Sequence, residues 1–253
     1  MKVASWNVNS VRVRLDQVLD WLERAKPDVL GLQEIKSLNE KFPLDAFAEL
    51  GYQCEVNGQK TYNGVALLSR KAAIDVIDAI PDFADEQRRI LAATFGKNRV
   101  INLYIPNGQS VDSDKYHYKL NWLDALQKWL KSEVAQHDQV VVMGDFNIAP
   151  EDRDVHDPEE WTGKVLCSDL ERDALQEIFD LGLTDSFRLF DQPDESFSWW
   201  DYRAGGYRHN RGMRIDLLLV SDAIAQTCTA SQIDTAPRKL ERPSDHAPVW
   251  IEF

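Results

Sequence analysis

Cysteine, histidine and methionine are scarce in this chain of 253 residues, which contains 3 Cys, 5 His and 3 Met. The three cysteines, Cys54, Cys167 and Cys228, are odd in number and lack the spacing of metal ligands. This scarcity argues against a disulfide framework and against a zinc site built from thiolates. We therefore expect reduced thiols in a cytoplasmic protein.

Long apolar runs are also missing, since no segment approaches the roughly 18 consecutive apolar residues of a membrane-spanning helix. The first residues, Met1–Trp6, enter a strand-like pattern directly and lack the charged and then apolar regions of a signal peptide. No linker, low-complexity stretch or convincing repeat interrupts the chain. We expect a single domain over residues 1–253 without membrane attachment.

Positive charge is in deficit, because 29 Lys and Arg residues face 42 Asp and Glu residues, which gives a net charge of −13. Proteins that bind nucleic acid by charge alone are usually basic, so this balance argues against that class. It does not exclude an enzyme with a basic rim around an acidic, cation-filled site, because net charge averages over the whole surface. The 43% hydrophobic content and 8 Trp are sufficient for a sizeable core.

Short apolar segments dominate the chain and a few amphipathic segments separate them. We expect strands at residues 2–9, 29–34, 54–56, 65–69, 91–95, 100–105, 140–143, 184–190, 215–220 and 248–253. We expect helices at residues 14–26, 44–50, 116–136 and 169–181, a loop at 149–164 and an extended aromatic segment at 197–202. Many short strands and few helices in one domain predict two sheets that are covered by helices on the outside.

The segment Val140–Asn147 combines a buried strand with polar side chains at its end. Asp145 and Asn147 are two residues apart, so in an extended chain they point to the same face. Gly144 allows another backbone to approach closely at this point. Asp and Asn also end many strands simply as turn formers. This segment alone leaves a functional and a structural interpretation open.

Polar side chains follow apolar runs in several other segments as well. Together with the segment above, these residues are Asn7, Asn9, Glu34, Tyr104, Asp145, Asn147, Asp216, Asp245 and His246. So many separate segments indicate that one edge of the sheets carries a site. Oxygen ligands with few histidines suit a hard ion such as Mg²⁺. An Asp–His pair without a Ser or Cys nucleophile indicates an activated water molecule instead of a covalent intermediate.

Seven motifs carry a family resemblance that covers essentially the whole chain. They are Ser5–Ser10, Leu32–Glu34, Asn63–Ser69, Tyr104–Gly108, Gly144–Asn147, Arg214–Leu219 and Ser244–Pro248. With these motifs in this order, the chain resembles the exonuclease III family of Mg²⁺-dependent DNA-repair nucleases, the class II apurinic/apyrimidinic endonucleases, within the wider endonuclease/exonuclease/phosphatase superfamily. The resemblance implies an α+β fold, a four-layered α/β/β/α sandwich in which two mostly antiparallel sheets pack face to face with helices outside.

The resemblance also implies roles for the polar residues. It implies metal ligands at Asn7, Glu34, Asp145, Asn147 and Asp245, with Mg²⁺ as the cofactor and Mn²⁺ as a substitute. It implies catalytic roles for Tyr104, Asp145, Asn147, Asp216 and His246. In this scheme Tyr104 and His246 contact the scissile phosphate, and Asp216 orients His246. Whether Asp145 acts as base, acid or metal ligand stays open, as does the share of Asn9 in metal binding.

Double-stranded DNA with abasic sites or blocked 3′ ends is the implied partner, and Asn107, Trp199, Met213 and His246 are the implied contacts. The segments 197–203 and 212–214 resemble family loops that border a pocket for a base-free deoxyribose, into which an abasic sugar can flip. By alternation Trp200 faces away from Trp199, so we expect it in the core. A basic collar around the backbone is expected to draw on Arg12, Lys60, Arg70, Lys71, Arg88, Arg89, Arg203, Arg208, Arg211 and Arg242.

The implied activity is incision 5′ to abasic sites, removal of 3′-blocking groups and 3′→5′ exonuclease action on duplex DNA. We expect a monomer that is cytoplasmic and associates with the nucleoid when it acts on DNA. Residues 109–114 and 149–168 fall where family members differ, and we expect them to set the balance among these activities. The alternatives are a superfamily relative acting on RNA, an inositol phosphate or a lipid headgroup, and a catalytically silent DNA-binding or scaffold protein.

Overall fold

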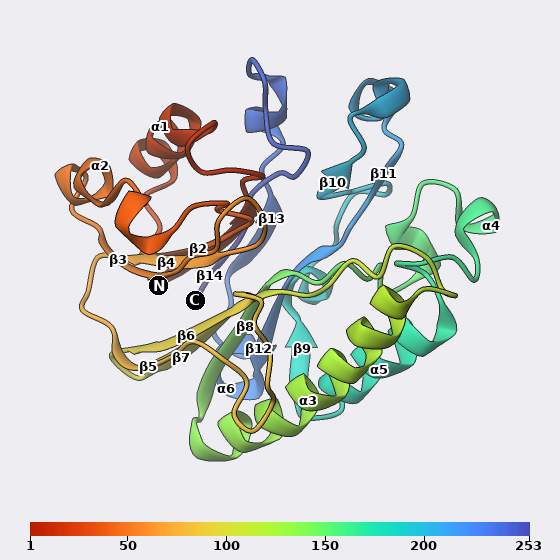
Figure 1. Ribbon diagram of the computed structural model, residues 1–253, viewed down its shortest axis with the longest axis horizontal. Coiled ribbons are helices and arrows are strands. Elements are labelled where there is room, and N and C mark those ends of the chain that lie inside the picture. Colours follow the sequence, from red (N-terminus) through yellow and green to blue (C-terminus); the bar gives the residue numbers. More distant parts are fainter.

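Two six-stranded sheets pack face to face and helices cover their outer faces, as Figure 1 shows for the computed structural model, which describes all 253 residues. The chain thus forms the expected four-layered α/β/β/α sandwich. Each sheet is mixed, with one parallel pair among antiparallel neighbours: β1 with β2 in the first sheet, and β7 with β8 in the second. No helix is long and apolar enough to cross a membrane.

The first sheet has the strand order β13-β14-β1-β2-β4-β3. Its strands are β1 (Lys2–Asn7), β2 (Val29–Gln33), β3 (Gln53–Asn57), β4 (Val65–Ser69), β13 (Ala230–Ile233) and β14 (Val249–Glu252). The second sheet has the order β5-β6-β7-β8-β12-β9. Its strands are β5 (Ile74–Ile77), β6 (Ile90–Phe95), β7 (Asn98–Tyr104), β8 (Gln139–Asp145), β9 (Leu183–Asp185) and β12 (Asp216–Ser221). A separate two-stranded ribbon joins β10 (Trp199–Trp200) to β11 (Gly212–Met213).

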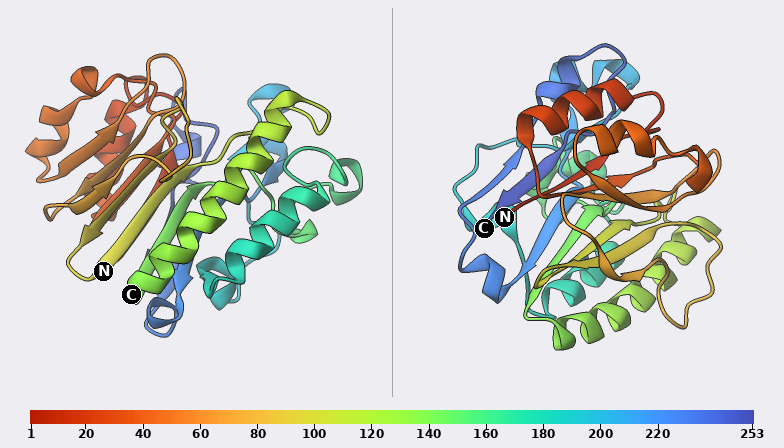
Figure 2. Two further views of the ribbon diagram at one scale, coloured as in Figure 1. Left: turned by 60° about the horizontal axis from the view of Figure 1, so that its bottom comes forward. Right: turned by 90° about the vertical axis from the view of Figure 1, so that its left-hand side faces the viewer.

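Helices form the two outer layers, and Figure 2 shows α3 and α5 lying side by side across the second sheet. The α-helices are α1 (Leu15–Ala25), α2 (Leu44–Glu49), α3 (Asp114–Gln136), α4 (Pro158–Trp161), α5 (Asp169–Phe179) and α6 (Asp222–Ala225). Short 3₁₀ helices are η1 (Asn39–Lys41), η2 (Asp152–Asp154), η3 (Ser186–Leu189), η4 (Arg203–Gly205), η5 (Tyr207–His209) and η6 (Ala236–Lys239). The N-cap serine of α5 forms a capping box with Glu171, which defines where that helix begins.

Alternation along the strands divides the core into layers. In β4, Val65 and Leu67 point between the sheets, whereas Ala66 and Leu68 point toward the helices α1 and α2. Each strand in the middle of a sheet therefore buries both faces, which explains the near-continuous apolar runs in the sequence. A third cluster fills the space between the second sheet and the helices α3 and α5.

Strand directions bring the polar strand ends to one edge of the sandwich. The parallel pairs β1–β2 and β7–β8 all end at this edge. Strands β12 and β14 run antiparallel to β8 and β1, so they begin at the same edge. The register places Asp145 opposite both Tyr104 and Asp216. Chain segments that are far apart in sequence therefore deliver their polar side chains to one place.

A close backbone contact within the second sheet and hydrogen bonds between the two sheets hold this edge in place. Gly144 has a φ of +148°, and a Cβ atom added there would lie 1.9 Å from the carbonyl oxygen of Leu103. Only glycine therefore allows β8 to approach β7 so closely just before Asp145. Between the sheets, the amide of Asn102 in β7 donates to the carbonyl oxygens of Leu32 and Ala66, both at 3.0 Å. This buried amide fixes the position of one sheet against the other.

Some local predictions were wrong. Residues 184–190 were predicted as a strand, but β9 ends at Asp185 because its carboxylate accepts a hydrogen bond from the Phe187 amide and starts η3. The predicted loop 149–164 contains η2 and α4. Strands β5 and β13 were not predicted; β5 is an exposed edge strand with an irregular register, which weakens its alternation signal.

Candidate active site

Asn7 joins the two carboxylates at the centre of the polar edge. Its side-chain nitrogen donates to Oε1 of Glu34 and to Oδ2 of Asp145, both at 2.9 Å. Its side-chain oxygen accepts from the Asn9 amide at 3.0 Å, which fixes the orientation of the Asn7 side chain. Asn7 is fully buried and Asp145 is almost so. The Asn7 amide thus connects the two sheets, because it binds Glu34 at the end of β2 and Asp145 at the end of β8.

His246 lies against the same Asp145 oxygen that accepts from Asn7, and its ring is oriented by Asp216. Nδ1 of His246 lies 2.9 Å from Oδ2 of Asp216, and Nε2 lies 3.7 Å from Oδ2 of Asp145. Ser198 donates to Asp216 Oδ2 at 2.7 Å and accepts from the Asp216 amide at 3.0 Å. These contacts fix Asp216, and through it the imidazole ring, so that Nε2 points toward the carboxylate cluster.

Burial and neighbouring charges shift the pKa values of this group strongly. Burial is the main cause that raises the pKa of Asp145 to about 7; the charges of Asp216 and Glu34 raise it further, while His246 and Asn7 oppose the shift. Burial lowers the pKa of His246, but the carboxylates of Asp216 and Asp145 outweigh it and raise that pKa to about 10. His246 is therefore a buried imidazolium at neutral pH, beside carboxylates that carry excess negative charge.

Tyr104 ends β7 beside the same carboxylates. Burial, together with the negative charges of Glu34 and Asp145, raises the pKa of its phenol well above the usual range. The guanidinium of Arg89 stacks on the ring, 4.6 Å from its centroid, and donates to the Tyr104 carbonyl at 3.0 Å. The phenol therefore stays protonated and can donate a hydrogen bond at neutral pH.

Asn147 and Asn107 form a pair next to Asp145. The Asn107 side-chain nitrogen donates to Oδ1 of Asn147 at 3.0 Å, and that of Asn147 donates to the Ile105 carbonyl at 3.0 Å. Asn147 has a left-handed backbone with a φ of +50°, and its amide donates to Oδ1 of Asp145 at 3.0 Å. The carboxylate therefore caps the turn that presents the two amides.

Asp245 lies on the side of the site that faces Trp199. Its Oδ1 accepts from the Asn9 side chain at 2.9 Å and its Oδ2 accepts from Trp199 Nε1 at 3.1 Å. Burial raises the pKa of Asp245, but the charge of His246 and these hydrogen bonds outweigh it and leave that pKa below its usual value. Asp245 is thus a stable anion.

Lys36 is part of the site and was missed by the sequence analysis. Its ammonium lies 2.9 Å from Oε2 of Glu34 and donates to Oδ1 of Asn9 at 2.6 Å. Glu34 and Lys36 both have left-handed backbones, with φ values of +49° and +50°. The sequence does place Lys36 two residues after Glu34, which could have indicated a contact. A lysine after a strand is usually a solvated surface charge, so this spacing alone did not predict one.

The residues at this edge fit a divalent cation. Ligand atoms of Glu34, Asp145 and His246 all lie within 4.8 Å of one another. The carboxylate oxygens of Glu34 and Asp145 are the donors that Mg²⁺ prefers. A cation here would relieve the repulsion that contributes to the raised pKa of Asp145. His246 has a positive charge and its Nδ1 lies on Asp216, so this imidazole fits a phosphate contact better than a metal ligand.

The aromatic rim differs in part from the prediction. Trp199 is half-buried and its ring lies 6.5 Å from that of His246, so it borders the site as predicted. Trp200 is buried as expected. Met213, predicted to contact DNA, has no exposed surface and packs in a small cluster with Trp199 at its edge. In this structure Met213 supports the rim from behind, because it pairs with Trp199 in the β10–β11 ribbon.

Three members of the predicted basic collar are not placed to form an exposed rim around the site. Arg89 is buried against Tyr104. Arg70 and Lys71 follow β4, which runs antiparallel to β2, so they lie at the edge opposite Glu34, where the Arg70 amide donates to the Asp28 carbonyl. The other seven predicted side chains are exposed. The structure gives them no contact with the site residues.

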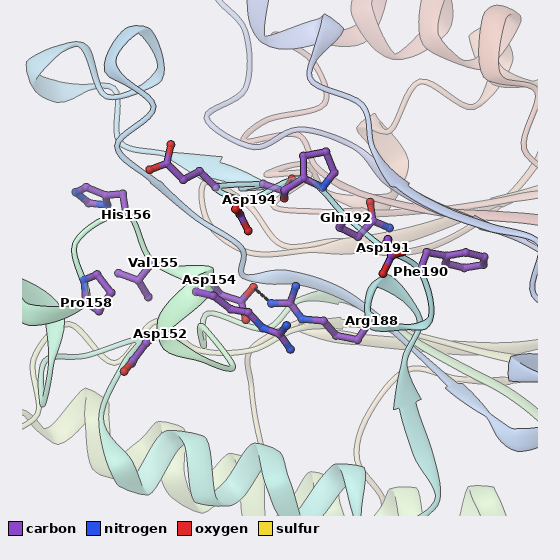
Figure 3. A pocket seen from close by; sticks show the side chains of 14 residues that line it. Asp152, Asp154, Val155, His156, Pro158, Arg188, Phe190, Asp191, Gln192 and Asp194 are labelled. Atoms are coloured by element: carbon purple, nitrogen blue, oxygen red, sulfur yellow. Dashed lines mark hydrogen bonds and ion pairs between the residues drawn. The ribbon is translucent and has the colours of Figure 1, made fainter.

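Arg214 is buried in an ion-pair network, whereas the sequence placed it on the rim. It donates to Asp154 at 2.7 and 3.1 Å and lies 2.8 Å from Asp185. Asp154 also accepts from Arg188, and both line a pocket of about 790 Å³, shown in Figure 3. This pocket lies between residues 152–158 and 190–196, away from Glu34 and Asp145. The ion pairs of Arg214 hold the segment after β8 against the segment that follows β11.

Comparison with known proteins agrees with the fold and identifies the family. Residues 4–246 match the model of the Endonuclease/Exonuclease/phosphatase family, so the chain belongs to this family. A relative named Exodeoxyribonuclease III, from Haemophilus influenzae, is 41% identical over 266 residues, with 100% of both chains covered. This match places the chain in the exonuclease III branch.

Two solved structures share the fold over the whole chain. One is a 3′ phosphatase, NExo, from Neisseria, bound to a product DNA hairpin; it is 46% identical, with a TM-score of 0.98, covering 100% of this chain and 99% of that one. The other is an AP endonuclease from Archaeoglobus fulgidus, 37% identical with a TM-score of 0.96 and the same coverage.

Proposed function

We propose that this protein is a Mg²⁺-dependent DNA-repair phosphodiesterase that acts as a monomer. Its proposed reactions are incision 5′ to abasic sites, removal of 3′-blocking groups and 3′→5′ degradation of duplex DNA. The observation that carries the proposal is the Asp216–His246–Asp145 arrangement beside Glu34, in which a buried imidazolium faces two carboxylates. The relatives support the choice of DNA, since they are described as an exodeoxyribonuclease, a 3′ phosphatase and an AP endonuclease.

Hydrolysis by a water molecule fits the groups at the site. Ser198 and Ser244 touch the site residues, but both hydroxyls are engaged, with Asp216 and with the Asn7 carbonyl respectively. Both serines are also buried, so neither hydroxyl is exposed to a substrate. Asp145, with a pKa near neutrality, can accept or return a proton at Oδ2.

Positive charge and hydrogen-bond donors surround the position proposed for the phosphate. His246 supplies a fixed positive charge at Nε2, and Tyr104 and Asn147 supply donors. When bound at Glu34, Mg²⁺ would neutralise charge that develops on the phosphate oxygens. Trp199 borders the site and offers an aromatic face to a base-free sugar or a 3′ terminus.

Incision of a duplex with one abasic analogue tests the proposal directly. We expect strand cleavage 5′ to the analogue with Mg²⁺ and none with EDTA, and the same metal requirement for release of a 3′-phosphate. Asp145→Asn, purified in parallel, serves as a control for contaminating nucleases. The proposal is refuted if the wild type in Mg²⁺ shows no incision and also releases no 3′-phosphate. Turnover of RNA, an inositol phosphate or a lipid headgroup instead would favour a different phosphohydrolase.

A further inference from the structure

A fully buried lysine supports the turn that carries Asn147. Lys119 lies in α3 and has no exposed surface. Its ammonium donates to the Asn147 carbonyl at 2.6 Å and to the Asn107 carbonyl at 3.2 Å. No other protein group donates to either carbonyl. One buried cation therefore connects the two loops whose amides pair beside Asp145.

The opposing charge comes from α5. Glu171 is also fully buried, and its Oε1 accepts from Lys119 at 2.5 Å. The same carboxylate accepts from the Leu166 amide at 3.1 Å and from the Ser168 hydroxyl at 2.5 Å. Glu171 is thus held by the capping box of α5, and it holds Lys119 in turn.

This chain of contacts acts on a strained part of the site. Asn147 has the left-handed backbone that presents its side chain to Asn107. Burying an ammonium costs free energy unless its hydrogen bonds are satisfied, so the position of Lys119 is sharply defined by its three acceptors. Loss of the ammonium would leave the carbonyls of Asn107 and Asn147 without a donor and free both loops to shift.

We propose that Lys119 is a positioning residue for the reaction, holding Asn107 and Asn147 in the geometry needed at the phosphate. This inference rests on the proposed function, because the reaction it concerns is phosphodiester hydrolysis at the site of Asp145. Lys119 acts through the two carbonyls and does not touch the substrate. Loss of Lys119 should therefore destabilise the transition state more than the bound substrate. We expect the rate at saturating DNA to fall more than the affinity for DNA.

Three variants separate positioning from folding. Lys119→Met removes the donor but leaves the Glu171 charge buried, so we expect a lower thermal midpoint and a single-turnover rate reduced by about 10- to 100-fold. Lys119→Met combined with Glu171→Gln removes both charges, and Gln keeps acceptor and donor groups for the α5 cap. We expect this double variant to recover the midpoint and to stay slow. Glu171→Gln alone keeps a side-chain oxygen that can accept from the ammonium, so we expect Lys119 to stay on both carbonyls and the variant to react at nearly the wild-type rate.

A matched control is a second buried ion pair, which joins the same helix, α3, to β7. Arg99 and Glu133 form a buried ion pair at 2.6 Å, at the end of β7 remote from Tyr104. Arg99→Met with Glu133→Gln removes an equivalent pair and should react like the wild type. Rates are compared below the lowest thermal midpoint, so that every variant is folded.

The result that supports the proposal is a slow Lys119→Met/Glu171→Gln variant with unchanged DNA affinity beside a fast control. The inference is overturned if the double variant matches the control, or if Glu171→Gln is as slow as Lys119→Met. A wild type that does not cleave the abasic duplex in Mg²⁺ would instead refute the proposed function, which keeps the two failures distinct.

Discussion

Asp216 holds the ring of His246 through both of its carboxylate oxygens, with Oδ2 at 2.9 Å and Oδ1 at 3.1 Å from Nδ1. Since the carboxylate accepts the Nδ1 proton, Nε2 of His246 is presented to Asp145. The pair stabilises the imidazolium, which is why His246 has a raised pKa despite complete burial. The charge of His246 therefore depends on Asp216.

Asp216→Asn should slow the reaction with little effect on DNA binding. The amide keeps the size of the side chain but removes the charge that stabilises the imidazolium. We expect the single-turnover rate at saturating Mg²⁺ and DNA to fall about 100-fold or more. Quench-flow measurement of abasic-duplex cleavage gives this rate, and a rate close to wild type would contradict the role of the pair.

Glu34→Gln should change the metal dependence of the reaction. The amide keeps the shape of Glu34 but removes one negative charge from a group whose donors suit Mg²⁺. We expect the Mg²⁺ concentration for half-maximal rate to rise about tenfold or more, with recovery at high Mg²⁺. A Mg²⁺ titration of the cleavage rate measures this shift. An unchanged titration curve would show that Glu34 is not a metal ligand.

Gly144→Ala should destabilise the fold at the active-site edge. A Cβ atom there would lie 1.9 Å from the Leu103 carbonyl oxygen, in a backbone that disfavours side chains. We expect the free energy of unfolding to fall by about 3 kcal/mol, because β8 must move away from β7. Gly96→Ala is the matched control, since its φ is also positive but no atom lies within 4 Å. Urea unfolding measures the free energy of unfolding of both variants. Equal losses of stability would contradict the role of the Gly144 contact.

The cysteine thiols should be unreactive at moderate pH. Burial raises the pKa of Cys54 to about 12 and that of Cys167 to about 11. The folded state therefore favours the protonated thiols, a preference that stabilises the fold below pH 9 and is lost as the pH rises toward 12. We expect slow alkylation of the native protein by iodoacetamide at pH 8 and faster alkylation above pH 10. Mass spectrometry measures the extent of alkylation, with the unfolded protein as a control. Rapid labelling of the native protein at pH 8 would contradict the prediction.

Much of the fold was predictable because buried strands leave strong patterns. Val65–Ser69 was predicted with the bounds of β4, and the strands predicted at 91–95 and 100–105 correspond to the paired β6 and β7. Short or exposed elements were not predicted: β5 has only four residues and is largely exposed, and η3 begins through a side-chain cap by Asp185 that competes with strand continuation.

The candidate site was predictable in its residues but less so in its contacts. Asn7, Glu34, Asp145 and His246 were expected at one edge, and they are in contact or within 4.8 Å. The sequence could not show that Lys36 would turn toward Glu34, or that Arg89 would stack on Tyr104. Those contacts depend on left-handed turns and on strand register, which a single sequence does not specify.

One site, built around Asp145, is expected to carry out every proposed reaction. Parallel single-turnover rates of wild type and Asp145→Asn on an abasic duplex and on a 3′-phosphate duplex test it most directly, with thermal midpoints to show that both proteins are folded. We predict that both activities of the variant fall together by at least about 100-fold. A folded Asp145→Asn variant that retains either activity at the wild-type rate would show that this activity does not depend on Asp145.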